Sequence, residues 1–333
     1  MNFREKYMAG ETDFDEIFDL TDQWNFSDDP RTLREFLGLT TEEEDVWISE
    51  SDEALELLLK KEKNRKIFFT DLDGTLLNDK KEITPRNRKA VEQLLKAGHV
   101  IAISTGRALQ SALIQAENLE LTEKNCYIIC YNGAQIYDIE RKKLLCRKTL
   151  PMECVRFAFD EAKKFGIDIQ TYSDTHVIAE KDNPNIRRYA ALQGLDYLIT
   201  DDVTQALPCE PPKMLALDFD DSDRVLAFQH YFSERCDGKI NLCLSDPVLL
   251  ELTPPEVSKG MAVRFLCEYL GIPLINSVAA GDAENDLSMI QAAHVGAAMC
   301  NGINTLKEHA DYITEADNNH DGIAEILEKF VLG

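Results

Sequence analysis

Along residues 65–141 the spacing of apolar and polar positions changes back and forth between two periods, which predicts strands and helices in turn. Short apolar runs that end at polar residues are typical of buried strands, and longer segments with apolar residues three or four positions apart are typical of helices. The predicted order is strand, helix, strand, helix, strand, at 67–70, 85–97, 100–104, from 108 onward, and 127–130. This alternation indicates an α/β fold with a Rossmann-like parallel sheet that has helices on both faces.

The same alternation resumes over residues 246–333. Helices are predicted at 259–270 and 285–293, and strands at 278–280 and 295–298. We expect the two series to share one sheet, so that residues 65–141 form its first half and residues 246–333 its second half.

Residues 142–245, between the two halves, have a different pattern. It predicts hairpin-like strands together with helices, the strands at 167–172, 177–179, 214–219 and 240–244 and the helices at 152–165 and 222–236. An α+β insertion between the halves of a parallel sheet predicts a cap domain that lies over the functional site.

The first 64 residues form a distinct acidic segment. Residues 1–60 contain 18 acidic and 5 basic residues, so their net charge of −13 is more than half of the chain's −24. Apolar spacing predicts short amphipathic helices, one of them starting at Thr40 or Thr41, where a hydroxyl can cap backbone amides. The run Lys60–Lys66 resembles a solvated linker. We slightly favour a charged appendage that aids solubility over a docking module for a protein partner.

Composition and charge narrow the function classes. The net charge of −24 argues against non-specific nucleic-acid binding, which needs a basic surface. Nine cysteines without CxxC pairs, and no secretory leader, indicate reduced thiols, and we expect a cytoplasmic protein. No apolar run approaches the roughly 18 residues of a transmembrane helix, so no membrane association is expected. A P-loop motif is absent, and six dispersed histidines do not suggest a zinc site.

The most informative motif is the pair Asp71 and Asp73, which follows the first predicted strand. Side chains two positions apart in an extended chain project to the same side, so these carboxylates can converge on one point. Mg²⁺ relieves the repulsion between such groups and completes its coordination with water and phosphate oxygens. Gly74 then allows a sharp departure from the strand. A solvated turn is the structural alternative, but it explains the full motif poorly.

Three further segments carry polar residues at predicted strand ends or helix starts, where open parallel sheets bind ligands. The Thr105 hydroxyl and the Gly106 amide can grip a phosphate oxygen, although Thr105 as a helix cap is an alternative. Lys259 begins a helix, where a cation is unfavourable for the helix dipole, and this hints at a role in neutralising phosphate. Isolated lysines, however, are usually solvated.

The last of these segments is Gly281–Asp286. Asp282 can complete a metal site, and Asn285 or Asp286 can orient Lys259, water or phosphate. The alternative is an ordinary capped helix, which accounts for one carboxylate and not for the whole cluster.

Together the motifs at 71–75, 104–107, 259 and 281–286 resemble, in order, the four motifs of the haloacid dehalogenase superfamily, phosphatase branch. Asn132-Gly133-Ala134 and the tail segments 310–314 and 321–322 further resemble its Cof-type subfamily, whose cap is the large α+β kind. The resemblance covers roughly residues 65–333.

The resemblance implies specific roles for these residues. Asp71 would be the nucleophile, Asp73 the general acid and base, and Thr105 and Lys259 phosphate ligands. The expected sets that follow are phosphate binding by Leu72, Thr105, Gly106, Lys259 and Asn285, and Mg²⁺ binding by Asp71, Asp73, Asp282 and Asp286. Asp73 would bind the metal through its backbone carbonyl.

The function expected from these residues is that of a Mg²⁺-dependent phosphatase of small phosphorylated metabolites, such as sugar phosphates, that acts through an aspartyl-phosphate intermediate. Two alternatives stay open: a phosphomutase, and a regulatory or binding protein that works through the acidic extension. Substrate choice is expected to lie in the cap, where the polar or aromatic candidates are Tyr172, Asp174, His176, Arg187 and Arg188. Arg107 is a further candidate for substrate contact.

Overall fold

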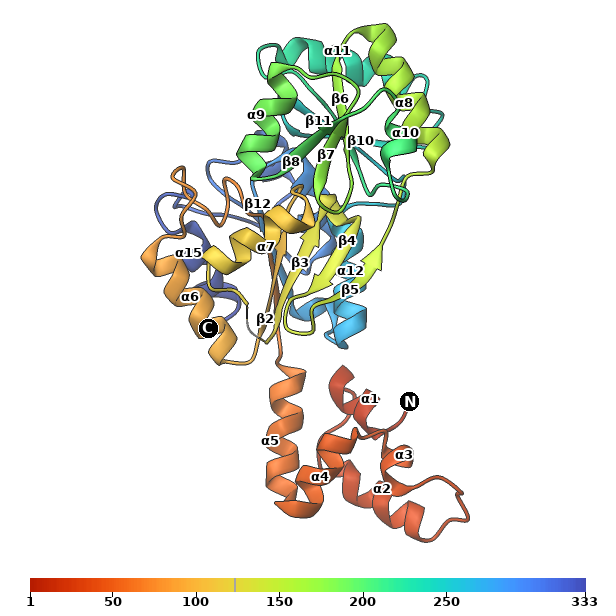
Figure 1. Ribbon diagram of the computed structural model, residues 1–333. Helices are drawn as coiled ribbons and strands as arrows, with labels where there is room; N and C mark the ends of the chain where they lie inside the picture. Colours follow the sequence, from red (N-terminus) through yellow and green to blue (C-terminus); the bar gives the residue numbers. More distant parts are fainter. Residues whose placement is uncertain (123) are drawn as a thin grey trace. The chain divides into compact units, whose positions relative to one another are not determined.

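The computed structural model describes residues 1–122 and 124–333 and divides into two compact units, Met1–Arg65 and Lys66–Gly333. Figure 1 traces both units along the chain. The larger unit contains two sheets, one of eight strands and one of six.

The eight-stranded sheet holds both predicted halves. Its order is β14-β13-β12-β1-β2-β3-β4-β5, parallel from β14 to β3 and antiparallel for β4 and β5. The strands are β1 (Ile67–Thr70), β2 (Val100–Ser104), β3 (Cys126–Cys130), β4 (Gln135–Asp138), β5 (Lys143–Arg147), β12 (Ser277–Gly281), β13 (Val295–Ala298) and β14 (Tyr312–Ile313). The prediction of one shared sheet is confirmed, because β12 of the second half pairs directly with β1 of the first.

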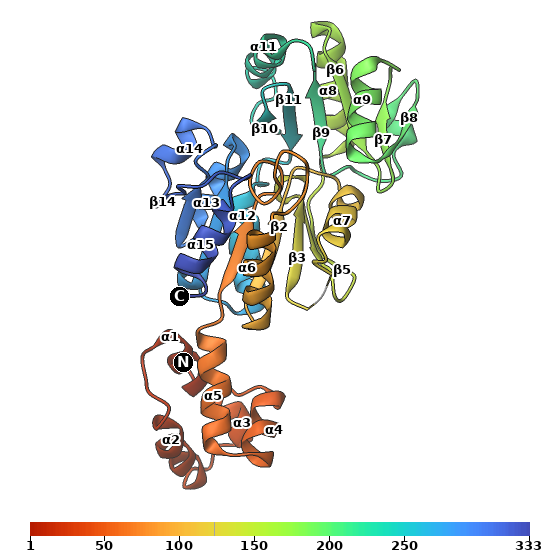
Figure 2. The same ribbon diagram turned by 90° about the vertical axis from the view of Figure 1, so that its left-hand side faces the viewer.

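Helices cover both faces of this sheet (Figure 2). Neighbouring residues of β1 point to opposite faces, so that Phe68 packs in one hydrophobic cluster and Phe69 in another. The Phe68 cluster includes residues of α6 (Pro85–Lys96), α7 (Leu109–Asn118) and α15 (Gly322–Phe330). The Phe69 cluster includes residues of α12 (Lys259–Leu270) and α13 (Leu287–Ala292). Short helix α14 spans Asn304–Glu308.

The inserted cap is an α+β domain built on the six-stranded sheet, ordered β10-β11-β9-β6-β7-β8. The strands are β6 (Asp168–Tyr172), β7 (His176–Ala179), β8 (Asp196–Ile199), β9 (Met214–Leu217), β10 (Asn241–Asp246) and β11 (Leu249–Thr253). The helices are α8 (Met152–Phe165), α9 (Pro184–Gln193), α10 (Val203–Ala206) and α11 (Ser222–Ser233). Residues of α8, α10 and α11 pack together in one cluster on this sheet.

The strands place the limits of the insertion differently from the predicted 142 and 245. β5, at 143–147, pairs with β4 in the core sheet, and β11, at 249–253, pairs with β10 and β9 in the cap sheet. The apolar pattern of a short strand shows that it is buried but does not show which sheet it joins. Both predicted boundaries were therefore several residues too early.

The smaller unit is a bundle of five short helices, α1 (Phe3–Ala9), α2 (Glu16–Asn25), α3 (Leu33–Leu37), α4 (Thr41–Ser49) and α5 (Asp52–Lys63). Buried apolar side chains, including Phe3, Ile17 and Leu55, form its own core. The predicted helix start is confirmed, since the Thr40 side chain caps α4. The predicted linker is wrong in its first part, because Lys60–Lys63 belong to α5, whose last turn suits cations.

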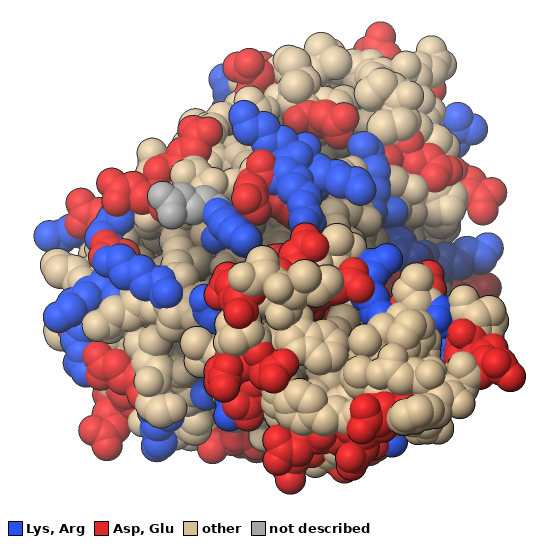
Figure 3. Space-filling view, turned by 90° about the horizontal axis from the view of Figure 1, so that it is seen from below, with Lys and Arg blue, Asp and Glu red and all other residues tan. Residues whose placement is uncertain are grey.

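Among the described residues, no helix is long and apolar enough to cross a membrane. On the face drawn in Figure 3, acidic side chains are spread among uncharged ones, and Lys and Arg side chains gather in the upper and left parts of the view.

Candidate active site

The predicted site residues follow neighbouring strands at the carboxyl edge of the core sheet. β1 lies between β12 and β2, so the segments that begin with Asp71, Asp282 and Thr105 start side by side. The ladder continues just past the strand ends, because the Asp71 amide donates to the Ala280 carbonyl at 2.9 Å and the Thr105 amide donates to the Ile129 carbonyl at 2.8 Å. The sheet itself therefore fixes the backbone of these segments.

Lys259 links two of the carboxylates. Its ammonium nitrogen lies 2.5 Å from Asp71 Oδ1 and 2.5 Å from Asp286 Oδ1, and its side chain is 0 % exposed. The Ser258 side chain caps α12 by accepting a hydrogen bond from the Met261 backbone amide. This cap fixes the first turn of the helix, which begins at Lys259. Asp286 therefore contacts Lys259, and its role in orienting the lysine stays a prediction.

Asp282 and Asp286 are held by the loop after β12. Asp286 Oδ2 accepts hydrogen bonds from the backbone amides of Asp282 and Ala283, at 2.9 and 3.0 Å. The Thr75 hydroxyl donates to Asp282 Oδ1 at 2.5 Å. Gly74, at φ +87°, passes so close to Asp282 that a Cβ at position 74 would lie 2.6 Å from Oδ2. A side chain at position 74 would therefore be strained by the backbone conformation, and the Asp282 carboxylate would have to shift to make room for it.

Three carboxylate oxygens, one each from Asp71, Asp282 and Asp286, lie within 4.8 Å of one another and form an acidic group that could hold a metal ion. Burial raises the pKa of Asp71 well above its usual value; Lys259 opposes this, while Asp286 and Asp282 add to it. Burial, followed by the charge of Asp286, raises the pKa of Asp282 to about 6. For Lys259, burial would lower the pKa, but its two carboxylate partners raise it above the usual value. The group favours a cation.

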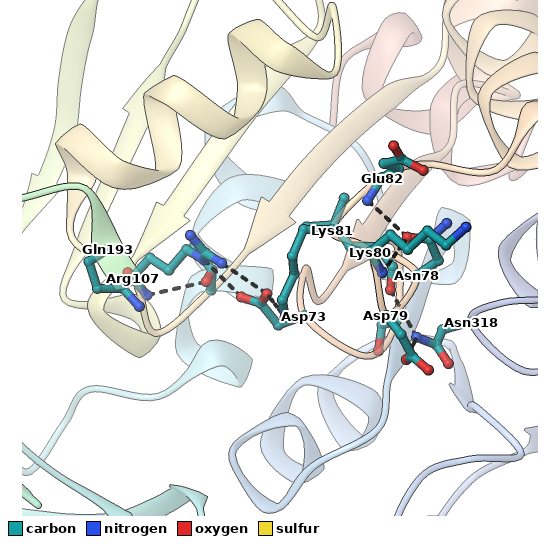
Figure 4. Close-up of polar contacts among 12 residues, drawn as sticks. Asp73, Asn78, Asp79, Lys80, Lys81, Glu82, Arg107, Gln193 and Asn318 are labelled. Carbon is teal, nitrogen blue, oxygen red and sulfur yellow. Dashed lines mark hydrogen bonds and ion pairs between the residues drawn. The ribbon is translucent and has the colours of Figure 1, made fainter. Parts of the chain in front are cut away.

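Asp73 points to a different set of partners (Figure 4). Arg107 binds both of its carboxylate oxygens, through Nε at 2.8 Å and Nη2 at 2.9 Å, and Lys81 Nζ lies 2.7 Å from Oδ1. Burial alone would raise the pKa of Asp73, but the hydrogen bonds and charges of Arg107 and Lys81 lower it. These contacts therefore favour the carboxylate form of Asp73.

The phosphate-loop prediction concerns Thr105, which is buried beside Asn132. The backbone N–H of Asn132 donates to the Thr105 carbonyl at 3.1 Å, and the Asn132 backbone has the left-handed conformation, at φ +56°. Asn285 Nδ2 donates to Asn132 Oδ1 at 3.1 Å. Asn132 Nδ2 and Asn285 Oδ1 are buried and have no hydrogen-bond partner within the described part of the chain. Two unpaired polar atoms at this place suit a polar ligand.

Comparisons with known proteins agree with this geometry. Residues 68–327 match the family model of the haloacid dehalogenase-like hydrolases. The chain belongs to this family. It is 29 % identical over 267 residues to the 5-amino-6-(5-phospho-D-ribitylamino)uracil phosphatase YcsE of Bacillus subtilis, a match that covers 80 % of this chain and 96 % of that protein.

Solved structures of related proteins have the same fold. A haloacid dehalogenase-like hydrolase from Bacteroides thetaiotaomicron superposes with a TM-score of 0.72 at 32 % identity, covering 80 % of this chain and 99 % of that one. A protein from Thermotoga maritima gives a TM-score of 0.68 at 32 % identity, covering 80 % and 97 %. The resemblance inferred from the four motifs is thereby confirmed, and the family match begins after the smaller unit, at residue 68.

Most of the cap residues expected to choose the substrate of this haloacid dehalogenase-like hydrolase are engaged elsewhere. Asp174 pairs with Arg147, Arg187 pairs with Asp182, and the Arg188 guanidinium lies over the Phe219 ring. His176 contacts its neighbour Thr175, and Tyr172 is buried against Tyr131 and Tyr189. The specificity role of these residues stays a prediction.

Four residues of the site had been assigned no role from the sequence, although Thr75 and Asn132 lie in motifs that the sequence analysis singled out. Thr75, Lys81, Asn132 and Asn301 contact the site residues or the loop after β1; Asn301 Nδ2 donates to the Gly74 carbonyl at 2.8 Å. For Thr75 and Lys81 a signal existed, because both lie in the loop that directly follows the paired aspartates. Asn301 is more than 200 positions from Gly74, and only the folded sheet brings the two together.

Proposed function

We propose that this hydrolase is a Mg²⁺-dependent phosphatase that acts on small phosphate monoesters of sugars or sugar alcohols through an aspartyl-phosphate intermediate. The observation that carries the proposal is the position of Lys259, whose buried ammonium group bridges Asp71 and Asp286 beside the Asp282 carboxylate. A cation held in this position can neutralise the negative charge of a phosphoryl group while one of the neighbouring carboxylates reacts with its phosphorus atom.

The proposed reaction has two displacements. Asp71 attacks phosphorus, the bond from phosphorus to the ester oxygen breaks, and the leaving oxygen takes a proton from Asp73. A water oxygen then attacks the aspartyl-phosphate, its proton goes to Asp73, and the electron pair of the broken acyl-phosphate bond returns to the Asp71 carboxylate. Asp73 enters the first displacement as a carboxylic acid. Its contacts with Arg107 and Lys81 stabilise the carboxylate that is left when the proton has gone, and this carboxylate accepts the proton of the attacking water in the second displacement.

The acidic group fits Mg²⁺. All its donors are carboxylate oxygens, which a hard cation prefers, and a cation would relieve the repulsion that raises the pKa values of Asp71 and Asp282. Both oxygens of Asp286 already accept hydrogen bonds from Lys259 and two amides, so we assign direct ligation to Asp71 and Asp282, with the Asp73 carbonyl as the further expected ligand. The chemistry supplied by a bound Mg²⁺ is neutralisation of the phosphoryl oxygens.

The substrate class draws on the relative YcsE, whose name gives its substrate as a ribitylamino-uracil phosphate, the phosphate ester of a sugar alcohol. The acidic surface of this chain makes a polyanionic substrate unfavourable and leaves a small monoester, neutralised locally by Lys259, as the better match.

A panel of phosphate monoesters tests the proposed function. The purified protein is expected to release inorganic phosphate from sugar or sugar-alcohol phosphates in the presence of Mg²⁺, and EDTA should abolish the release. Free phosphate is measured directly, so that transfer to a second hydroxyl of the substrate, the reaction of a phosphomutase, is distinguished from hydrolysis. Activity that is equal with EDTA and with Mg²⁺ would contradict the metal requirement, and isomerised ester without free phosphate would favour the mutase.

We also infer that the smaller unit, residues 1–65, which the sequence alone slightly favoured as an appendage that aids solubility, serves contact with another protein and takes no part in turnover. It has its own hydrophobic core and lies outside the family match. Its surface is acidic and exposes large apolar side chains, Phe26 at 92 %, Ile48 at 78 % and Leu57 at 70 %. Such a surface matches a partner with basic and apolar side chains.

Deleting residues 1–65 is expected to leave kcat/KM within about 2-fold, because every proposed site residue lies in the other unit, which has its own core. The measurement compares the truncated and full-length proteins with the same ester and the same Mg²⁺ concentration, after circular dichroism has established that both are folded. A fall of about 10-fold or more in the folded truncated protein would give the smaller unit a part in turnover.

A further inference from the structure

A second buried cation, Lys213, lies where the cap meets the core. It directly precedes β9, and its side chain is 0 % exposed. The ammonium nitrogen donates to the Gly106 carbonyl of the core at 2.6 Å and lies 2.6 Å from Glu251 Oε2 of cap strand β11. The rings of Tyr172 and Tyr131 are 5.1 and 5.8 Å from it. A buried ion pair is often no more stable than apolar residues of the same size, so stability alone does not explain this one.

The contact with Gly106 fixes a peptide plane in the loop after β2. The Gly106 carbonyl and the Arg107 N–H belong to the same planar peptide group and point in opposite directions. That N–H donates to the Thr105 hydroxyl oxygen at 3.2 Å. A hydroxyl that accepts from the backbone still has its own hydrogen to donate, so the Thr105 O–H is left for an acceptor such as a phosphate oxygen.

A second cap residue is linked to the same loop through Ser111 of α7. Arg107 Nη1 donates to the Ser111 hydroxyl at 3.3 Å, and that hydroxyl donates to Gln193 Oε1 of cap helix α9 at 3.2 Å. Figure 4 shows Gln193 beside Arg107. The peptide between Gly106 and Arg107 and the Arg107 side chain are thus both tied to the cap.

We propose that Lys213, paired with Glu251, is a positioning residue through which the cap orients the phosphate-binding loop: its bond to the Gly106 carbonyl holds the peptide that sets the Thr105 hydroxyl as a phosphate donor. The inference rests on the proposed function, because it assigns Thr105 to phosphate. Since Lys213 and Glu251 both belong to the cap, moving the cap away from the core would withdraw the ammonium and weaken the phosphate site. Phosphate affinity therefore depends on cap position.

The test uses the full chain and inorganic phosphate as the probe. In Lys213→Met/Glu251→Gln both charges are removed together, so no unpaired carboxylate stays buried; Lys213→Met/Glu251→Leu is a second neutral pair in case the first folds poorly. Calorimetry with Mg²⁺ present is expected to show a Kd for phosphate raised about 10- to 100-fold. Lys239→Met, an exposed cap lysine, is the matched control and should leave the Kd unchanged.

A double-mutant cycle with Thr105→Val separates positioning from general disruption. If Lys213 acts through the Thr105 hydroxyl, the neutral pair should change the Kd by less than about 2-fold when that hydroxyl is already gone. An equal loss in both backgrounds, or an unchanged Kd when the Thr105 hydroxyl is present, would overturn the inference. Wild-type protein that hydrolyses esters while the neutral pair binds phosphate normally would reject only this inference, whereas wild-type protein that hydrolyses none of the panel would reject the proposed function.

Discussion

Replacing Asp71 by asparagine is expected to reduce kcat about 10³-fold or more, because the amide cannot form the proposed aspartyl-phosphate. The substitution is nearly isosteric, and the asparagine oxygen can still accept the hydrogen bond that Lys259 donates to Asp71 Oδ1. The measurement is the steady-state release of phosphate from the best ester of the panel, with mass spectrometry to verify that the asparagine has not reverted to aspartate. Turnover close to wild type in the verified Asp71→Asn protein would remove Asp71 as the nucleophile.

The same variant leads to a second prediction, which concerns stability. Turnover should fall, but the free energy of unfolding should not. The pKa of Asp71 is raised in the folded protein, so the folded state binds a proton at Asp71 more tightly than the unfolded state does. The contribution of Asp71 to the free energy of unfolding therefore decreases as pH rises above the unfolded pKa of about 3.9. At pH 7 without metal the neutral asparagine avoids this cost. We expect Asp71→Asn to be at least as stable as wild type in thermal unfolding with EDTA, so its loss of turnover cannot be attributed to unfolding.

The sequence was sufficient to place Asp71 and Asp282 together because each directly follows a strand that the apolar pattern marks clearly. Asp71 and Asp282 follow strands that pair directly, and α12 begins at Lys259, as predicted. In a parallel sheet the carboxyl ends of paired strands lie at the same edge, so residues that directly follow two paired strands lie close together there. Predicting the strands therefore also predicts the position of the site.

The partners of Asp73 could not be predicted in the same way. Lys81 reaches it from the loop after β1, and Arg107 from the loop after β2, and both are charged residues of a kind that is usually solvated. Their position depends on how two irregular loops fold over the sheet edge, which periodicity does not report. Lys213 is a stronger case, because its bond to Gly106 spans 107 positions and exists only where the cap meets the core.

Replacing Lys259 by methionine is expected to lower the free energy of unfolding by about 3–5 kcal/mol in EDTA, because it removes the cation from a buried group and leaves two carboxylates, Asp71 and Asp286, without it. Turnover should also fall steeply, since the proposed reaction loses the charge that neutralises the phosphoryl group. Chemical denaturation gives the first quantity and phosphate release the second. Lys239→Met serves as the control, with an expected change in the free energy of unfolding of less than about 0.5 kcal/mol.

Magnesium distinguishes the two parts of this effect. If the destabilisation comes from repulsion among Asp71, Asp282 and Asp286, a bound divalent cation should relieve it, and Mg²⁺ should stabilise Lys259→Met more than it stabilises wild type. Turnover should not recover to the same extent, because Mg²⁺ would not supply the hydrogen bonds that the Lys259 ammonium group donates to Asp71 and Asp286. A variant as stable as wild type in EDTA would show that Lys259 does not neutralise the group. Full recovery of turnover with Mg²⁺ would show that its charge is not needed for the reaction.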